Sequence, residues 1–176
     1  MSIVVDIKTR VFDDTDVAYR LFPGQGYRHY QIMKNNSVVF LDNPGIPLPS
    51  ADGYAKDDDL LVEITKSEEK QSLIYADDVG LDSQLQHIDT KVYEDLRWGP
   101  KRDLNRGWLN ALYHTAKIGD LVVVPSPGLV KNDNGDWVRS KTLVGEISQC
   151  PRKMGTIWSA KYDQGPVSYT TGSLVS

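Results

Sequence analysis

Short apolar runs, broken by glycine, proline or asparagine, alternate along the chain with polar segments. Runs rich in β-branched and aromatic residues are typical of strands, whereas apolar positions three or four residues apart are typical of helices. The runs predict strands at 2–8, 18–22, 37–41, 120–125, 137–147, 156–161 and 166–169. The asparagine- and glycine-containing segment 132–136 predicts a hairpin turn before the strand at 137–147.

The clearest helical pattern spans 103–117. Its apolar positions repeat at helical spacing and predict one buried face, made of Leu104, Trp108, Ala111, Leu112 and Ala116. Asp103 is suited to cap the helix, and Gly119 to the left-handed residue beyond its end. Shorter helices are expected at 27–34, 66–77 and 84–96, a loop at 42–50, and either a strand or a helix at 60–64. Together these elements predict the α+β class.

The length of 176 residues fits a single domain, here 1–176. Cys150 is the only cysteine, so an internal disulfide and a cysteine-based zinc site are excluded, which favours a reducing compartment, the cytoplasm. The apolar run at 3–5 is too short for the core of a signal peptide, and no stretch has the length of a membrane span. We therefore expect no membrane partner.

Charge is concentrated in two neighbouring segments. Residues 51–82 hold ten acidic side chains and three lysines, a net charge of -7, whereas 97–107 carries four basic side chains and one aspartate, a net charge of +3. The whole chain has a formal net charge of -4, which argues against a protein that coats nucleic acid by bulk charge. Both segments fit a solvated surface, and the acidic one also fits a surface for a basic protein partner.

Catalytic signatures are missing from the sequence. It contains no phosphate-binding Walker loop, no paired-histidine zinc motif and no nucleophile elbow. Its three histidines are far apart, and the aspartates at 57–59 fit a solvated loop better than a cation site. We therefore expect a non-enzymatic protein with no cofactor and no metal.

Two segments have the composition of a binding site. In 23–30, glycines would let the backbone approach a ligand closely while tyrosines stack on it, although a tight turn with core tyrosines fits equally well. In 97–108, basic side chains alternate with tryptophans, as a site for phosphates and stacked bases requires. A loop anchored to the core by those tryptophans remains the alternative for this second segment.

The order of several motifs resembles the EVE-like branch of the PUA/YTH superfamily, which includes the domain at the N-terminus of Mrr-type restriction proteins. The matching residues lie at 20–26, 37–40, 107–109, 117–125 and 143–147. This resemblance implies a small, partly open β-barrel surrounded by helices. It also implies a pocket that holds a modified nucleobase, in RNA or flipped from DNA, and a role in prokaryotic defence against foreign DNA.

Carried onto this chain, the resemblance assigns roles to ten side chains. The stacking faces would come from Tyr27, Tyr30, Trp98 and Trp108. The base edge would be contacted by Gln25, Asn105 and Ser126, and flanking phosphates by Lys101, Arg102 and Arg106.

The chain departs from the family pattern in two places. Leu41 and Asp42 stand where the family has a tryptophan, and the gap before Gly107 contains the acidic insertion at 51–82, which would repel nucleic acid near a pocket. A non-enzymatic module for a modified nucleobase or nucleotide-like ligand is the leading hypothesis. The alternative is an acidic protein-interaction domain, and an enzyme acting on nucleotides comes third.

Overall fold

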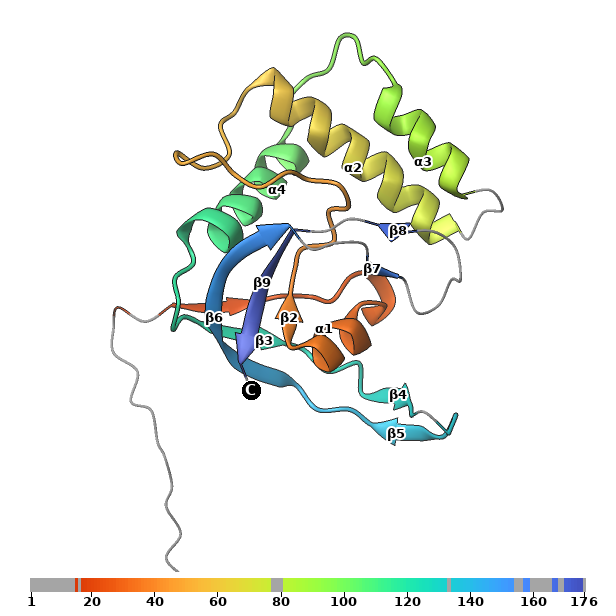
Figure 1. Cartoon of the computed structure of the whole chain (residues 1–176), viewed down its shortest axis with the longest axis vertical. Coiled ribbons are helices and arrows are strands. Elements are labelled where there is room, and N and C mark those ends of the chain that lie inside the picture. Colours follow the sequence, from red (N-terminus) through yellow and green to blue (C-terminus); the bar gives the residue numbers. More distant parts are fainter. Residues whose placement is uncertain are drawn as a thin grey trace, which may run out of the picture.

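The computed structural model describes residues 15, 17–76, 81–132, 134–153, 157–158, 166–167 and 170–175. The strand expected at 2–8 lies outside these residues. The described part has a mixed α+β architecture, as expected, built from a five-stranded sheet, two small hairpins and several helices (Figure 1). Within it, no helix combines the length and the apolar character needed to cross a membrane.

The central sheet has the strand order β1-β3-β6-β9-β2. Its strands are β1 (Ala18–Arg20), β3 (Leu121–Val124), β6 (Leu143–Lys153), β9 (Thr170–Val175) and β2 (Val38–Val39). β1 and β3 run parallel, and the other neighbours are antiparallel. The described strands do not close into a barrel, because β1 and β2 form the two edges of the sheet.

Two hairpins lie beside the sheet. β4 (Leu129–Lys131) pairs with β5 (Trp137–Arg139), and β7 (Ile157–Trp158) pairs with β8 (Pro166–Val167), which confirms the hairpin turn at 132–136 and the last strand pair. Asn132 holds the turn, since its side-chain oxygen accepts hydrogen bonds from the backbone N–H groups of Asn134 at 3.0 Å and Asp136 at 2.8 Å. In Figure 1 the β4–β5 hairpin projects from the end of the molecule opposite α2 and α3.

The helices form two groups. The 3₁₀ turn η1 (Gln25–Tyr27) and α1 (Tyr30–Asn36) lie between β1 and β2 in the sequence. α2 (Asp58–Ala76), α3 (Leu81–Thr90) and α4 (Pro100–Asn110), followed by the π-helical turn η2 (Ala111–Thr115), gather at the other end of the sheet (Figure 1). The ambiguous segment 60–64 is thus helical and continuous with the helix predicted at 66–77, whereas α3 ends before the expected 96.

The core lies between the sheet and the helices. It follows the strand alternation, since Val122 and Val124 of β3 are buried while Leu121 and Val123 are only half-buried. Its largest fully buried side chains are Leu21, Tyr30, Met33, Val39, Phe40, Leu61, Ile64, Leu109, Val122 and Val124.

The buried face predicted for the helix at 103–117 is partly wrong. Leu104 is 64% exposed and Trp108 45% exposed, whereas Leu109, Leu112 and Tyr113 are buried. The helix contacts the core only through its last turns, and the π-helical turn after Asn110 changes which side chains face inward. The helix also starts earlier than predicted: Pro100 occupies its first turn, so Asp103 is not the cap.

The single strand predicted at 137–147 is also wrong. The chain leaves β5 after Arg139 and enters β6 at Leu143, so the segment pairs first with β4 and then with β3. The sequence pattern also missed β9, the strand that links β6 to β2.

Candidate functional site

A pocket of about 510 Å³ lies at the glycine-containing turn after β1. It is lined by Phe22, Gly24, Gln25, Gly26, Tyr27, Asp42, Gln71 and Tyr75. These residues come from three segments: the turn itself, the loop that follows β2, and the C-terminal half of α2. We call it the turn pocket.

Strand alternation places an aromatic ring at the rim of this pocket. Tyr19 and Leu21 point into the core, so Arg20 and Phe22 face the other way. The Arg20 guanidinium lies 5.0 Å from the centroid of the Phe22 ring, and Phe22 is 57% exposed. An exposed ring with a cation beside it is suited to stack on a planar, electron-rich ligand.

Gly24 allows the turn to form. Its φ of 76° is unfavourable for any residue with a side chain, and a Cβ atom here would lie 2.5 Å from His29 Cδ2 and 2.8 Å from Asp42 Oδ2. Gly26 also has a positive φ, but no atom lies within 4 Å of the position its Cβ would take. Gly24 is therefore required both by its backbone conformation and by the side chains packed against it.

Asp42 links the three segments of the pocket. One carboxylate oxygen accepts a hydrogen bond from the nearly buried His29 at 2.9 Å, and the other accepts one from the Tyr75 hydroxyl. The backbone carbonyl of Asp42 accepts a further bond from the Gln71 amide at 2.7 Å. The Tyr75 oxygen in turn accepts the backbone N–H of Gln25 at 2.8 Å, so helix α2 is tied directly to the turn.

These contacts fix the charge state of the pocket. Burial by itself would raise the pKa of Asp42, but hydrogen bonds from His29, Tyr75 and Gln71 and the charge of His29 outweigh it and hold that pKa below its usual value. Burial, reinforced by the hydrogen bond to Asp42, raises the pKa of Tyr75. At neutral pH Asp42 is therefore a carboxylate that accepts hydrogen bonds, and Tyr75 is a neutral donor.

A second guanidinium, that of Arg28, packs against the Tyr75 ring of the pocket. Arg28 lies 4.0 Å from the centroid of the Tyr75 ring and donates a hydrogen bond to the Ile74 carbonyl at 3.2 Å. A cation on the ring face stabilises the position of that ring. Tyr75 is thus fixed by hydrogen bonds at its hydroxyl and by a cation at its ring face.

Of the ten residues predicted to form a site, two line the turn pocket: Gln25, whose side chain is exposed, and Tyr27, which is half-buried. Sequence reasoning missed Phe22, Gln71 and Tyr75, and treated Asp42 only as a departure from a family pattern. The only sequence signal that could have linked two of these residues is the spacing of Gln71 and Tyr75, which lie four residues apart and so share one face of a helix.

The predicted phosphate contacts lie elsewhere and pair with acidic side chains. Lys101 and Arg102 both contact Glu68, each at 3.1 Å, and Arg106 contacts Asp103 at 3.2 Å. The same aspartate also binds Lys56 at 2.8 Å. Glu68 of the acidic insertion therefore pairs with two cations of the basic segment across α2 and α4.

The other predicted side chains are also outside the turn pocket. Tyr30 is 1% exposed and has no ring face free for a base, so we leave it out of the site. Trp98 packs against the core, and Trp108 and the half-buried Asn105 lie on α4. The Ser126 hydroxyl, in the loop before β4, donates a hydrogen bond to the carbonyl of Ser140, just after β5, at 3.0 Å.

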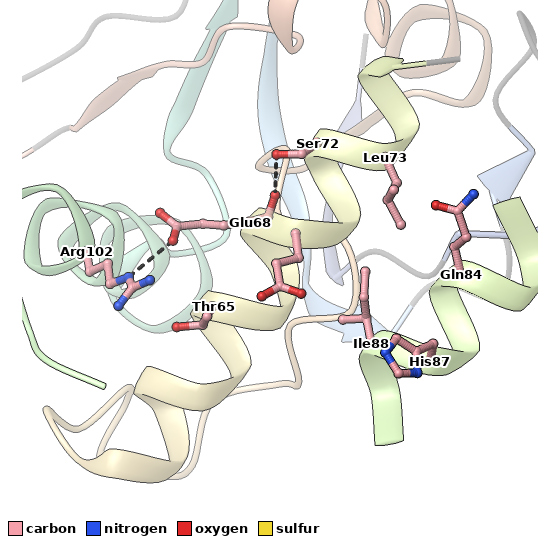
Figure 2. Close-up of a pocket in the computed structure, with 9 residues that line it drawn as sticks. Thr65, Glu68, Ser72, Leu73, Gln84, His87, Ile88 and Arg102 are labelled. Atoms are coloured by element: carbon pink, nitrogen blue, oxygen red, sulfur yellow. Dashed lines mark hydrogen bonds and ion pairs between the residues drawn. The ribbon is translucent and has the colours of Figure 1, made fainter. Parts of the chain in front are cut away.

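A second pocket, of about 620 Å³, lies between α2, α3 and the start of α4. Figure 2 shows Leu73 and Ile88 extending into the gap between α2 and α3, while Arg102 reaches toward Glu68. The two acidic side chains on its wall have cationic partners. Glu68 pairs with Lys101 and Arg102, and Glu69 pairs with Lys91 at 2.7 Å. It is a gap in a helix interface that is spanned by ion pairs.

The acidic run at 57–59 has a structural role. The Asp57 carboxylate accepts the backbone N–H of Leu60 at 2.8 Å, and Asp58 and Asp59 occupy the first turn of α2. Negative charge at this end stabilises a helix. The described residues contain no group of three or more histidine, cysteine, aspartate or glutamate side chains that could hold a metal ion.

Comparisons of the chain with protein-family models, with curated proteins and with solved structures find no match. The case for a function therefore depends on the geometry of the turn pocket.

Proposed function

We propose that the chain is a non-enzymatic binding module of the PUA/EVE-like type, whose turn pocket holds a modified nucleobase or a nucleotide-like ligand. One observation carries the proposal: an exposed aromatic ring, an exposed amide and an ionised carboxylate converge on one pocket, from Phe22, Gln25 and Asp42.

The pocket supplies the two kinds of contact that a nucleobase needs. Phe22 and Tyr27 offer rings for stacking, and the amides of Gln25 and Gln71 with the Asp42 carboxylate offer donors and acceptors for the base edge. The volume of about 510 Å³ lies within the range of small-molecule sites, roughly 300–1,000 Å³.

The sheet supports the finer fold assignment, a partly open barrel. β6 is long enough to pair with β3 over its first four residues and with β9 from Glu146 onward, and its register with β9 shifts between Ile147 and Arg152. Such irregularities bend a strand, and Figure 1 shows β6 curving strongly around the core. A curved, mixed sheet whose described strands end at β1 and β2 without closing is compatible with the architecture that the resemblance implies.

Calorimetric titration with a panel of nucleosides and short oligonucleotides, unmodified and carrying methylated or hydroxymethylated bases, tests the proposal. We expect saturable binding of at least one modified base and weaker binding of its unmodified counterpart. A folded protein that binds no member of the panel would refute it.

The alternative of an acidic interaction domain has less support. The acidic insertion uses Asp57 to cap α2, and Glu68 and Glu69 in ion pairs within the chain. Replacing the aspartates at 57–59 by asparagine tests it directly. Capture of a protein partner that is lost in this variant would favour the alternative over the turn pocket.

A further inference from the structure

A groove of about 430 Å³ separates α1 from the β4–β5 hairpin and the start of β6. Its lining contains three ionisable side chains other than tyrosine, Lys34, Arg139 and Lys141, and all three are cationic. The Tyr30 hydroxyl donates to the Lys141 carbonyl and fixes one wall of the groove to the other. We call this feature the hairpin groove.

The cations of the hairpin groove differ in one respect from the basic cluster at 97–107 that the sequence predicts. Among the described residues, no carboxylate forms an ion pair with Lys34, Arg139 or Lys141, whereas Lys101, Arg102 and Arg106 all have acidic partners. The acidic side chains closest along the chain are Asp136, exposed in the hairpin turn, and Glu146, half-buried in β6. The positive charge of the groove is therefore available to a ligand.

An exposed tryptophan lies on the same strand as Arg139, two residues away, so the two side chains share one face of β5. Trp137 of β5 is 66% exposed, and the Lys131 ammonium lies 5.4 Å from its ring centroid. Unpaired cations beside an exposed aromatic ring combine backbone attraction with base stacking, which is the chemistry of single-stranded nucleic-acid sites.

We propose that the hairpin groove binds the sugar–phosphate backbone of a nucleic-acid strand, with Trp137 stacking on one of its bases. This inference rests on the proposed function for the kind of ligand, and it adds that the ligand is a polynucleotide rather than a free nucleotide. A purely acidic peptide would satisfy the cations but would leave the exposed Trp137 ring without a stacking partner.

The position of the groove fits a strand that also reaches the turn pocket. The segment from η1 to α1 is continuous: Gln25 and Tyr27 line the pocket at its start, and Lys34 lines the groove at its end. The seven residues of α1 extend about 10 Å at 1.5 Å per residue. The two features are therefore joined by one short segment of chain.

The test is the salt dependence of binding to a fluorescein-labelled oligothymidylate, compared between the native protein and the double variant Arg139→Gln/Lys141→Gln. Each lost contact to a single-strand phosphate lowers the slope of log K against log salt by about 0.7, so the double variant is expected to lose roughly 1.4. Lys101→Gln/Arg102→Gln is the matched control, because it removes the same charge from residues that already have partners; its slope is expected to stay unchanged.

The outcomes separate this inference from the proposed function. If nucleosides bind and Phe22→Ala weakens them, but the oligonucleotide slope is the same in Arg139→Gln/Lys141→Gln and the native protein, the groove proposal is overturned and the pocket stands. If the slope falls while no nucleoside binds, the groove stands alone. Absence of oligonucleotide binding, or equal binding of poly-glutamate that competes with it, also overturns the groove proposal.

Discussion

The imidazole of His29 and the carboxylate of Asp42 meet at 2.9 Å, and both lie against the backbone of Gly24. This contact connects the turn after β1 to the loop after β2. Because the other Asp42 oxygen accepts the Tyr75 hydroxyl, the same carboxylate also holds α2 in place. Packing and hydrogen bonding around one side chain therefore shape the turn pocket, and the variants below separate these contributions.

Gly24→Ala is expected to be more destabilising than Gly26→Ala. At position 24 a side chain meets both an unfavourable backbone conformation, which costs about 1–3 kcal/mol, and the atoms of His29 and Asp42. At position 26 there is open space, so only the left-handed backbone penalty of about 1–2 kcal/mol applies. Urea denaturation of both variants measures the difference, and equal free energies of unfolding would contradict the packing seen at Gly24.

Asp42→Asn is expected to destabilise the protein at neutral pH and to flatten its stability profile in acid. The pKa of Asp42 is lowered in the folded state, so its contribution is present above the unfolded value near 4 and is lost as the pH falls through the folded value. Denaturation at a series of pH values between about 2 and 7 measures the slope. A variant whose stability falls with acid as steeply as that of the native protein would exclude this role for Asp42.

Tyr75→Phe removes one hydroxyl that both Asp42 and the Gln25 N–H contact. We expect a loss of about 1–3 kcal/mol in unfolding free energy, because a half-buried carboxylate loses a donor, together with weaker ligand binding. Tyr54→Phe is the control, since its hydroxyl bonds to the Pro47 carbonyl at 2.8 Å away from the pocket. That variant should lose stability but bind normally; parallel losses of binding in both would point to general unfolding.

Asp57→Ala is expected to lower stability by about 1 kcal/mol, since its side chain caps α2 through the Leu60 N–H. Asp58→Ala, which removes the same charge without a cap, should cost only about 0.3–1 kcal/mol. Thermal denaturation of the pair distinguishes a capping residue from a residue kept for a partner. Unchanged stability in Asp57→Ala would show that the acidic run is not structural.

The sequence predicts the elements whose signals are local. The β-branched runs around Val38 and Val122 and the turn at 132–136 are bounded by strong breakers, and they form where expected. The helix at 103–117 is found, but its buried face is not, because Trp108 precedes the turns that reach the core. Whether a helix face is buried depends on the neighbours it meets, which its own spacing does not define.

In the candidate site, too, only the residues with a local signal are predictable from the sequence. Gln25 and Tyr27 are predictable because glycines mark their turn, whereas Asp42 and Tyr75 join them only through tertiary contacts across more than one segment. The two charged segments are visible in the sequence, but their mutual pairing through Glu68 is not. Near the hairpin groove, Trp137, Arg139 and Lys141 are close in the sequence, but the meeting of the two cations with Lys34 is not predictable, because most of the chain separates them.

The most direct test of the central claim is calorimetric titration of the native protein, Phe22→Ala and Trp108→Ala with the best modified nucleoside of the panel. Both residues are exposed aromatics, but only Phe22 lines the turn pocket. The account predicts that Phe22→Ala weakens binding by about 1–3 kcal/mol, the value of one stacked base, while Trp108→Ala leaves it unchanged. Normal binding by Phe22→Ala, with loss in Trp108→Ala, would contradict it and would place the site on α4 instead.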